Sequence, residues 1–139
     1  MKRAVKGVLK FCAEIACVIL LVFILFIGYL HIGKKAALET PVYGLDLSKI
    51  DDGTYVGSYE GQRWSNTVSV TLKNHAITKI EVIKPQTFTS QETIDTLISR
   101  ITSEQRTDVD AVSGATADSK TFLSAVENAL YLAAHDALE

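Results

Sequence analysis

A long apolar run is the first feature of the pattern of hydrophobic and polar positions. Residues 15–32 contain no Asp, Glu, Lys or Arg, and residues 11–13 extend the run. At about 1.5 Å per residue, a helix over residues 15–32 is roughly 27 Å long, close to the thickness of the bilayer hydrocarbon. Glu14 follows Lys10 by one helical turn, so the two side chains can pair. The pattern predicts that residues 1–35 hold a cytoplasmic N-terminus and a single transmembrane helix.

A cleaved signal peptide is the alternative to a retained anchor. Its hydrophobic region would be unusually long, and residues 33–36 contain no suitable cleavage site of small residues. Four basic residues precede the run, whereas two follow it, at Lys34 and Lys35. Because basic residues favour the cytoplasmic side, we expect a cytoplasmic N-terminus and an extracytoplasmic location for residues 33–139.

The pattern changes to a period of two after residue 50. Residues 54–61, 66–73 and 76–84 alternate apolar and polar side chains, and Asn74-His75 is a short turn between the last two runs. Such alternation predicts an antiparallel meander with one buried face. Residues 36–50, between the apolar run and the first strand, are predicted to form a juxtamembrane linker.

A period typical of helices follows the predicted strands. Thr89 to Glu92 has the spacing of a capping box, with Thr89 as the expected N-cap. The apolar stripe of the first helix is Ile94, Leu97, Ile98 and Ile101. A second helix is predicted from about Ser119 to Leu138, with inward side chains at Phe122, Leu123, Val126, Leu130 and Ala133. The predicted fold class is α+β: an N-terminal single transmembrane helix, then a small antiparallel sheet of three to four strands packed with two helices.

The charge distribution narrows the possible functions. Residues 1–32 carry four basic residues and one acidic residue, whereas the rest of the chain carries ten basic and fifteen acidic residues. An acidic exported part argues against nucleic acid as a partner, because nucleic-acid affinity depends largely on cationic contacts to phosphate. Cys12 and Cys17 both lie in or beside the apolar run, so the exported part has no thiolate metal site. We expect no bound metal.

The candidate site is the segment Asp110–Thr116, which reads Asp-Ala-Val-Ser-Gly-Ala-Thr. Ser113, Gly114 and Ala115 are small, and Gly114 adopts positive φ at little cost, so a tight and open turn is expected. Thr116 lies where the last helix begins, and free backbone N–H groups at a helix start favour an anion such as phosphate. A plain helix cap is the far more common role of such a segment.

This segment resembles the signature of the FMN-binding domain, which occurs in the sodium-translocating NADH:quinone reductase, in the Rnf complex and in small membrane-anchored flavoproteins. Ser119-Lys120, the helix over 125–130 and the segment Asp52–Gly57 extend the resemblance to about residues 50–138. It implies that residues 51–139 form the FMN-binding domain. One position departs from the signature: Asp118 stands where the family usually has Thr or Ser, and its carboxylate would repel a bound phosphate.

The resemblance also implies how the cofactor is held. A flavin transferase, using FAD and magnesium, would esterify the hydroxyl of Thr116 with the phosphate of FMN. Ser113, Gly114 and Ala115 would shape the acceptor loop, and Asp110 would open the motif that the transferase recognises. The exposed faces of aromatic side chains suit a flavin ring, and the candidates are Tyr55, Tyr59 and Trp64. Cations near the reduced ring would stabilise its charge, and the candidates are Arg63 and Lys120.

The function implied by the resemblance is that of a membrane-anchored extracytoplasmic flavoprotein that relays electrons between redox partners, one of them in the membrane. The sequence holds no zinc-protease motif, nucleophile elbow or P-loop, so an electron-transfer protein or subunit is expected more than a stand-alone enzyme. The alternative is a membrane-anchored binding or assembly module, or a subunit of a reductase complex, that holds flavin non-covalently or not at all.

Overall fold

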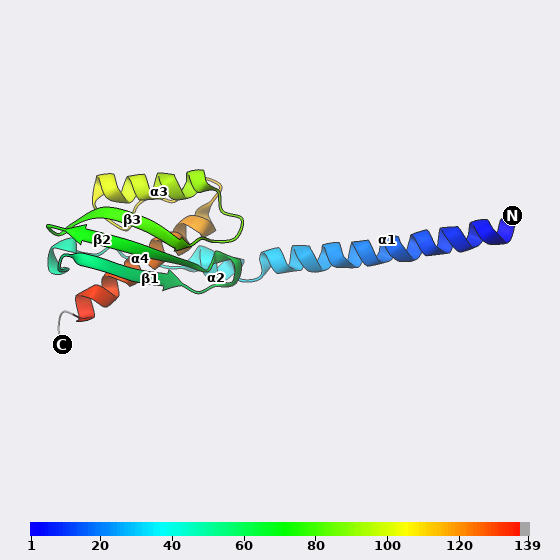
Figure 1. Ribbon diagram of the computed structural model, residues 1–139, viewed down its shortest axis with the longest axis horizontal. Helices are drawn as coiled ribbons and strands as arrows, with labels where there is room; N and C mark the ends of the chain where they lie inside the picture. The colour runs from blue at the N-terminus through cyan, green and yellow to red at the C-terminus, as the bar shows by residue number, and fades with distance from the viewer. Residues whose placement is uncertain (137–139) are drawn as a thin grey trace. The chain divides into compact units, whose positions relative to one another are not determined.

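The computed structural model describes residues 1–136, and internal contacts divide the chain into two units at the Ile32–Gly33 junction (Figure 1). The first unit is the helix α1 (Lys2–His31), of which no residue is buried within the unit. The apolar helical run within Lys2–Glu39 has a mean hydropathy of 2.8 and is long and apolar enough to cross a membrane. The predicted pair is present, with 4.0 Å between Lys10 Nζ and Glu14 Oε1. The first unit is therefore consistent with a single-pass anchor.

The second unit is built on the predicted antiparallel meander. Its strands β1 (Gly53–Tyr59), β2 (Asn66–Lys73) and β3 (Ala76–Lys84) lie in the order β1-β2-β3. The two-residue turn between β2 and β3 has positive φ at Asn74 and His75, as left-handed hairpin turns require. The α+β fold class predicted from the sequence is confirmed.

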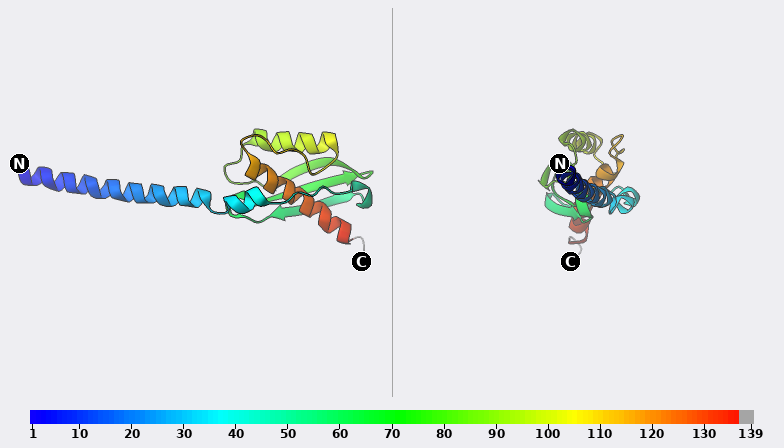
Figure 2. Two further views of the ribbon diagram at one scale, coloured as in Figure 1. Left: turned by 180° about the vertical axis from the view of Figure 1, so that it is seen from behind. Right: turned by 90° about the vertical axis from the view of Figure 1, so that its right-hand side faces the viewer.

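Two helices cover one face of the sheet. The helix α4 (Thr116–Asp136) crosses this face and packs on β1 and β2, whereas α3 (Gln91–Glu104) lies beside β3 (Figures 1 and 2). The inward side chains of β2 alternate as expected, and they share one core with both helices. The central members of this core are Val68, Val70, Leu72, Ile94, Leu97, Ile101, Phe122, Leu123, Val126 and Leu130. Leu138, the predicted end of the last helix, lies outside the described residues.

The N-cap of α3 differs from the prediction. Ser90, not Thr89, is the cap, because Ser90 Oγ accepts a hydrogen bond from the backbone N–H of Thr93 at 3.2 Å. The hydroxyl of Thr89 instead donates to Gln86 Oε1 at 2.7 Å. Thr89 is thus engaged in a local hydrogen bond within the loop, and the helix starts one residue later than predicted.

A close backbone approach fixes α4 on the sheet. A Cβ atom added at Gly57 would overlap the backbone nitrogen of Ala129 and the carbonyl oxygen of Ala125, and would lie 2.6 Å from Ala129 Cα. Only glycine in β1 and small residues in α4 permit this approach. The contact sets the position of α4 and, with it, of Thr116 at the first turn of the helix.

Residues 33–50 pack against the rest of the second unit. They contain α2 (Lys34–Glu39), which ends before Thr40-Pro41, and a 3₁₀ turn at Leu47–Lys49. Ala37 and Ile50 are each 1% exposed. The side chain of Lys120 on α4 donates to the carbonyl oxygen of Leu38 at 2.8 Å. This segment, which we call the connector, therefore lies along α4.

Candidate functional site

The predicted open turn precedes α4. The backbone N–H of Ala115 donates to Val112 O at 3.0 Å, which closes the turn. Gly114 has a φ of 79°, and a Cβ atom added there would meet nothing within 4 Å. Ser113, Gly114 and Thr116 are exposed. The turn is therefore open around Gly114, and Thr116 is exposed beside it.

Thr116 is the first residue of α4. Ser119 N donates to Ala115 O at 2.8 Å and makes the first bond of the helical ladder. The amides of residues 116–118 precede this bond, so they carry the partial positive charge of the helix start. An exposed hydroxyl and three such amides thus lie together, an arrangement suited to a phosphoester.

Two side chains that sequence reasoning did not single out for this role hold the loop. Ser119 Oγ accepts from Val112 N at 3.0 Å and donates to Ala115 O at 2.8 Å, and Ser119 is fully buried. Arg100 of α3 donates from Nη1 to the carbonyl oxygen of Asp110 at 2.6 Å. Asp110 itself is exposed. In the sequence, Ser119 was noted only as part of the resemblance to the family signature. No sequence pattern indicated that Arg100 contacts the loop.

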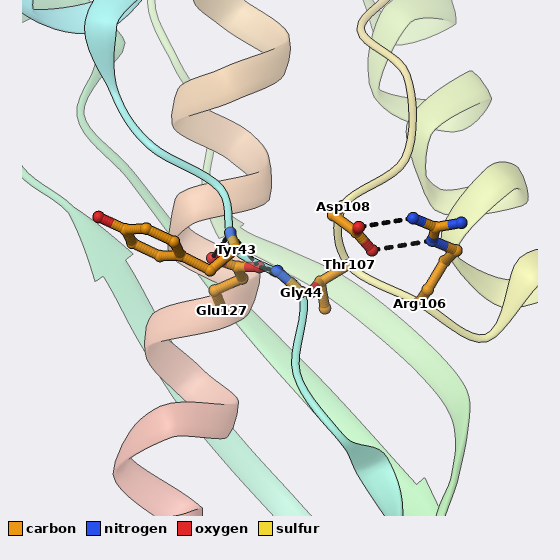
Figure 3. A network of polar contacts seen from close by, with 6 residues as sticks. All are labelled: Tyr43, Gly44, Arg106, Thr107, Asp108 and Glu127. Carbon is orange, nitrogen blue, oxygen red and sulfur yellow. Dashed lines mark hydrogen bonds and ion pairs between the residues drawn. The ribbon is translucent and has the colours of Figure 1, made fainter.

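Glu127 of α4 ties the connector to the segment that leads into the site (Figure 3). Its carboxylate accepts from Tyr43 N at 3.1 Å, from Gly44 N at 2.6 Å and from the hydroxyl of Thr107 at 2.8 Å. Glu127 is 7% exposed and Thr107 is fully buried. Gly44 has a φ of 73°, and a Cβ atom there would lie 2.9 Å from the carboxyl carbon of Asp108. Sequence reasoning missed this network because its members are distant in the chain.

An ion pair lies beside this network. Arg106 Nε donates to Asp108 Oδ1 at 2.8 Å (Figure 3). The hydrogen bond from Arg106 lowers the pKa of Asp108, and the same bond raises the pKa of Arg106. Asp108 therefore stays ionised to a lower pH than an isolated aspartate.

Buried polar atoms without a hydrogen-bond partner gather near the start of α4. Within residues 1–136 these atoms are Arg63 Nε, Trp64 Nε1, Asn66 Oδ1 and Asp118 Oδ1, which we call the polar cluster. The amide nitrogen of Asn66 donates to Thr121 O at 3.2 Å, which places the Asn66 side chain against the second turn of α4. Native proteins leave only a few buried polar groups unpaired per roughly 100 residues, and a water, an ion or a ligand commonly accounts for such groups.

The side chains predicted to lie near the flavin ring differ in their environments. Trp64 is fully buried, and the guanidinium carbon of Arg63 lies 3.9 Å from its ring centroid. Tyr55 and Tyr59 are half-buried and pack against the core. Lys120 is also half-buried, and its ammonium group is bonded to the connector.

The comparisons with known proteins address the same region. Residues 64–131 match the family model of the FMN-binding domain. The second unit contains an FMN-binding domain. No curated protein matches the chain. The long apolar N-terminal helix beside this domain is consistent with a membrane-anchored flavin-binding protein, as the resemblance implied.

The residues present fit FMN. The first turn of α4 offers three amides to a phosphate, and the hydroxyl of Thr116 is exposed next to them. Two members of the polar cluster, Arg63 and Asp118, are half-buried, and they are a donor and an acceptor without a partner within the described residues. A flavin ring carries hydrogen-bond acceptors and one N–H donor along its pyrimidine edge, so both kinds of group are needed to bind it.

Proposed function

We propose that this protein is an extracytoplasmic flavoprotein that carries FMN as a phosphoester of Thr116 and relays electrons between redox partners. The observation that supports this most is the exposed hydroxyl of Thr116 at the first residue of α4, within the stretch that matches the FMN-binding domain. Ser113, Gly114 and Ala115 leave the hydroxyl accessible, and Asp110 lies at the entrance of the loop, where a modifying enzyme reaches it.

The attachment is a phosphoryl transfer from FAD catalysed by a flavin transferase with magnesium. The bond between the FMN phosphorus and the oxygen of the AMP moiety breaks, and the bond between this phosphorus and Thr116 Oγ1 forms. AMP leaves with the bridging oxygen, and the hydroxyl proton of Thr116 passes to a base of the transferase. The amides of residues 116–118 then face the phosphate, whose negative charge they stabilise. When bound, the flavin accepts and donates electrons.

The location follows from the first unit. We propose that α1 is a retained single-pass anchor with a cytoplasmic N-terminus, because basic residues are more numerous before the apolar run than after it. A covalent bond suits an extracytoplasmic flavin, since cofactor released there is lost by dilution. The anchor keeps the flavin near a redox partner in the membrane, which raises their effective concentration.

One observation favours a second function, that of a membrane-anchored binding or assembly module without covalent flavin. Asp118 lies in the first turn of α4, and its Oδ1 is buried without a partner among the described residues. A carboxylate in this position competes with a phosphate for the same amides. Replacing Asp118 with threonine is therefore expected to raise the fraction of protein that carries flavin, and unchanged loading removes this reason for the second function.

A denaturing gel separates the two functions. The full chain is co-produced with a flavin transferase, denatured and viewed under ultraviolet light before staining. We expect a fluorescent band at the mass of the protein and no such band for Thr116→Val, whose side chain has a similar volume but no hydroxyl. Thr116→Ser, which retains a hydroxyl, serves as the control and should still be labelled at a reduced level. Protein that is yellow when folded but gives no band holds its flavin reversibly, and this result would overturn the covalent proposal.

A further inference from the structure

We propose that the loop of residues 85–90 receives the isoalloxazine ring of the flavin, with Phe88 as the apolar platform under the ring. This inference rests on the proposed function, because it requires a flavin tethered at Thr116. A flavin at Thr116 can extend toward either of two sides of α4, and the loop of residues 85–90 lies on one of them. The other side faces the connector.

The loop of residues 85–90 is fastened to the first two turns of α4. Gln86 Nε2 donates to the carbonyl oxygen of Asp118 at 3.0 Å and lies 2.8 Å from Thr121 Oγ1. The backbone N–H of Thr87 donates to Arg63 O at 2.9 Å, which joins the loop to the polar cluster. Asp118 is two residues from Thr116, so the loop lies within the region that a tethered flavin can reach.

Phe88 is an unusual residue in this loop. Its side chain is 67% exposed, and its φ is 67°. A bulky residue with positive φ is a genuine outlier, and such strained backbone gathers at ligand-binding sites. Packing in the core does not account for an exposed phenyl ring that is held in a costly conformation. A planar apolar ligand beside the start of α4 does account for it, because flat aromatic rings stack on one another.

The polar cluster lies on the same side of α4. Arg63 Nε and Trp64 Nε1 are donors, whereas Asn66 Oδ1 and Asp118 Oδ1 are acceptors. Trp64 and Asn66 are buried under the surface, whereas Arg63 and Asp118 are half-buried. Arg63 and Asp118 are therefore the donor and the acceptor that can turn toward the pyrimidine edge of a flavin, which accepts at its carbonyl oxygens and donates at N3–H. Asp118 is only half-buried, so its side chain can rotate toward a ligand.

The connector side offers less to a flavin. Its cavity nearest Thr116 has a volume of about 190 Å³ and is lined by Val42, Lys120 and Leu123 among others, and this volume is below the roughly 300 Å³ of small ligand sites. Two charged side chains on this side already have partners, since Lys120 binds Leu38 O and Glu127 binds the amides of Tyr43 and Gly44. A larger groove of about 450 Å³, lined by Tyr43 and Ser124, begins two turns along α4 from Thr116.

Flavin fluorescence tests which side the ring occupies, because a tryptophan in contact with a flavin quenches its emission. Full-chain protein is first shown by mass spectrometry to carry flavin on Thr116, so a failure of the proposed function is seen before the ring is examined. We expect Phe88→Trp to lower the flavin quantum yield and lifetime at least twofold. The matched control Tyr43→Trp, at an exposed aromatic residue of the connector, should leave both within a tenth of the wild-type values.

A second variant covers the case in which Trp64 already quenches the flavin strongly. Phe88→Gly removes the ring and relieves the positive φ, so we expect a higher melting temperature together with at least twofold stronger quenching of the flavin by iodide. Unchanged iodide quenching in Phe88→Gly, or a loss of emission in Tyr43→Trp but not in Phe88→Trp, would overturn the inference. Phe88→Gly also separates contact with the flavin from backbone strain at residue 88. Relief of strain alone would raise the melting temperature without exposing the flavin to iodide.

Discussion

Replacing Glu127 with alanine tests how the second unit holds the segment that leads to Thr116. The carboxylate of Glu127 accepts hydrogen bonds from the amides of Tyr43 and Gly44 and from the hydroxyl of Thr107. Alanine cannot accept any of them. The connector and the segment that leads into the site would lose their common attachment to α4.

The loss of stability in Glu127→Ala can be estimated from the three hydrogen-bond donors that lose their acceptor. A buried donor without a partner costs about 1–3 kcal/mol. Thr107 is fully buried and bears this cost, whereas Tyr43 is 80% exposed, so water can reach the amide at this position more easily. We therefore expect Glu127→Ala to lower the free energy of unfolding by about 3–5 kcal/mol, a large share of the roughly 5–15 kcal/mol typical of a folded domain. Glu127→Gln keeps one carbonyl oxygen and should cost about 1–2 kcal/mol, since bonds to a charged acceptor are the stronger ones.

Trp64 provides the assay, because it is the only tryptophan of the chain and is fully buried in the second unit. Its emission during urea unfolding of the full chain in detergent micelles reports on this unit without a signal from α1. Ser124→Ala, one turn before Glu127 on α4, is the matched control and should change stability by less than about 0.5 kcal/mol. A Glu127→Ala protein as stable as the control would refute the assigned role of the carboxylate.

Three further predictions concern the sheet, the hairpin turn and the acceptor loop. Gly57→Ala should lower the stability by about 2–4 kcal/mol, because its Cβ would overlap the backbone of α4, and a urea midpoint like that of the wild type would contradict this contact. The amides of His75 and Asn74 lower the pKa of Asp52. The contribution of Asp52 to folding stability is therefore fully present above the ordinary pKa of about 3.9 and is lost as the pH falls through the lower pKa of the folded state. In an acid titration, the free energy of unfolding should fall less steeply for Asp52→Asn than for the wild type. Gly114→Val places a β-branched residue at a φ of 79°, at a cost of about 1–2 kcal/mol, and should reduce flavin loading. Gly114→Asn is the control, because asparagine adopts positive φ more readily than valine. Equal loading of the two variants would show that the turn tolerates any residue.

Local patterns predicted most of the fold. The strict alternation of Val68, Val70 and Leu72 placed β2 at its observed bounds, and the apolar stripe of α3 identified its buried face. The exchange of Thr89 for Ser90 as N-cap depended on a contact with Gln86. Thr89 and Ser90 are both good N-caps by residue type, so the sequence pattern does not decide between two adjacent candidates.

The candidate site was predictable only where a signature exists. The open turn at Gly114 and the start of the helix near Thr116 follow from residue type. The residues that hold the site in place cannot be predicted from residue type. Glu127 looks like an ordinary charged residue of an amphipathic helix, and only the fold places Thr107 beside it. Phe88 gave no signal, because an isolated phenylalanine in a loop does not reveal a positive φ in the sequence.

Peptide mapping of the purified full chain tests the attachment most directly. After co-production with a flavin transferase and digestion, the peptide that contains Thr116 should gain the mass of FMN less one water, and fragmentation should assign the gain to Thr116. The account is contradicted if this peptide is recovered only in its unmodified form while an established flavin-acceptor domain, produced with the same transferase, is loaded.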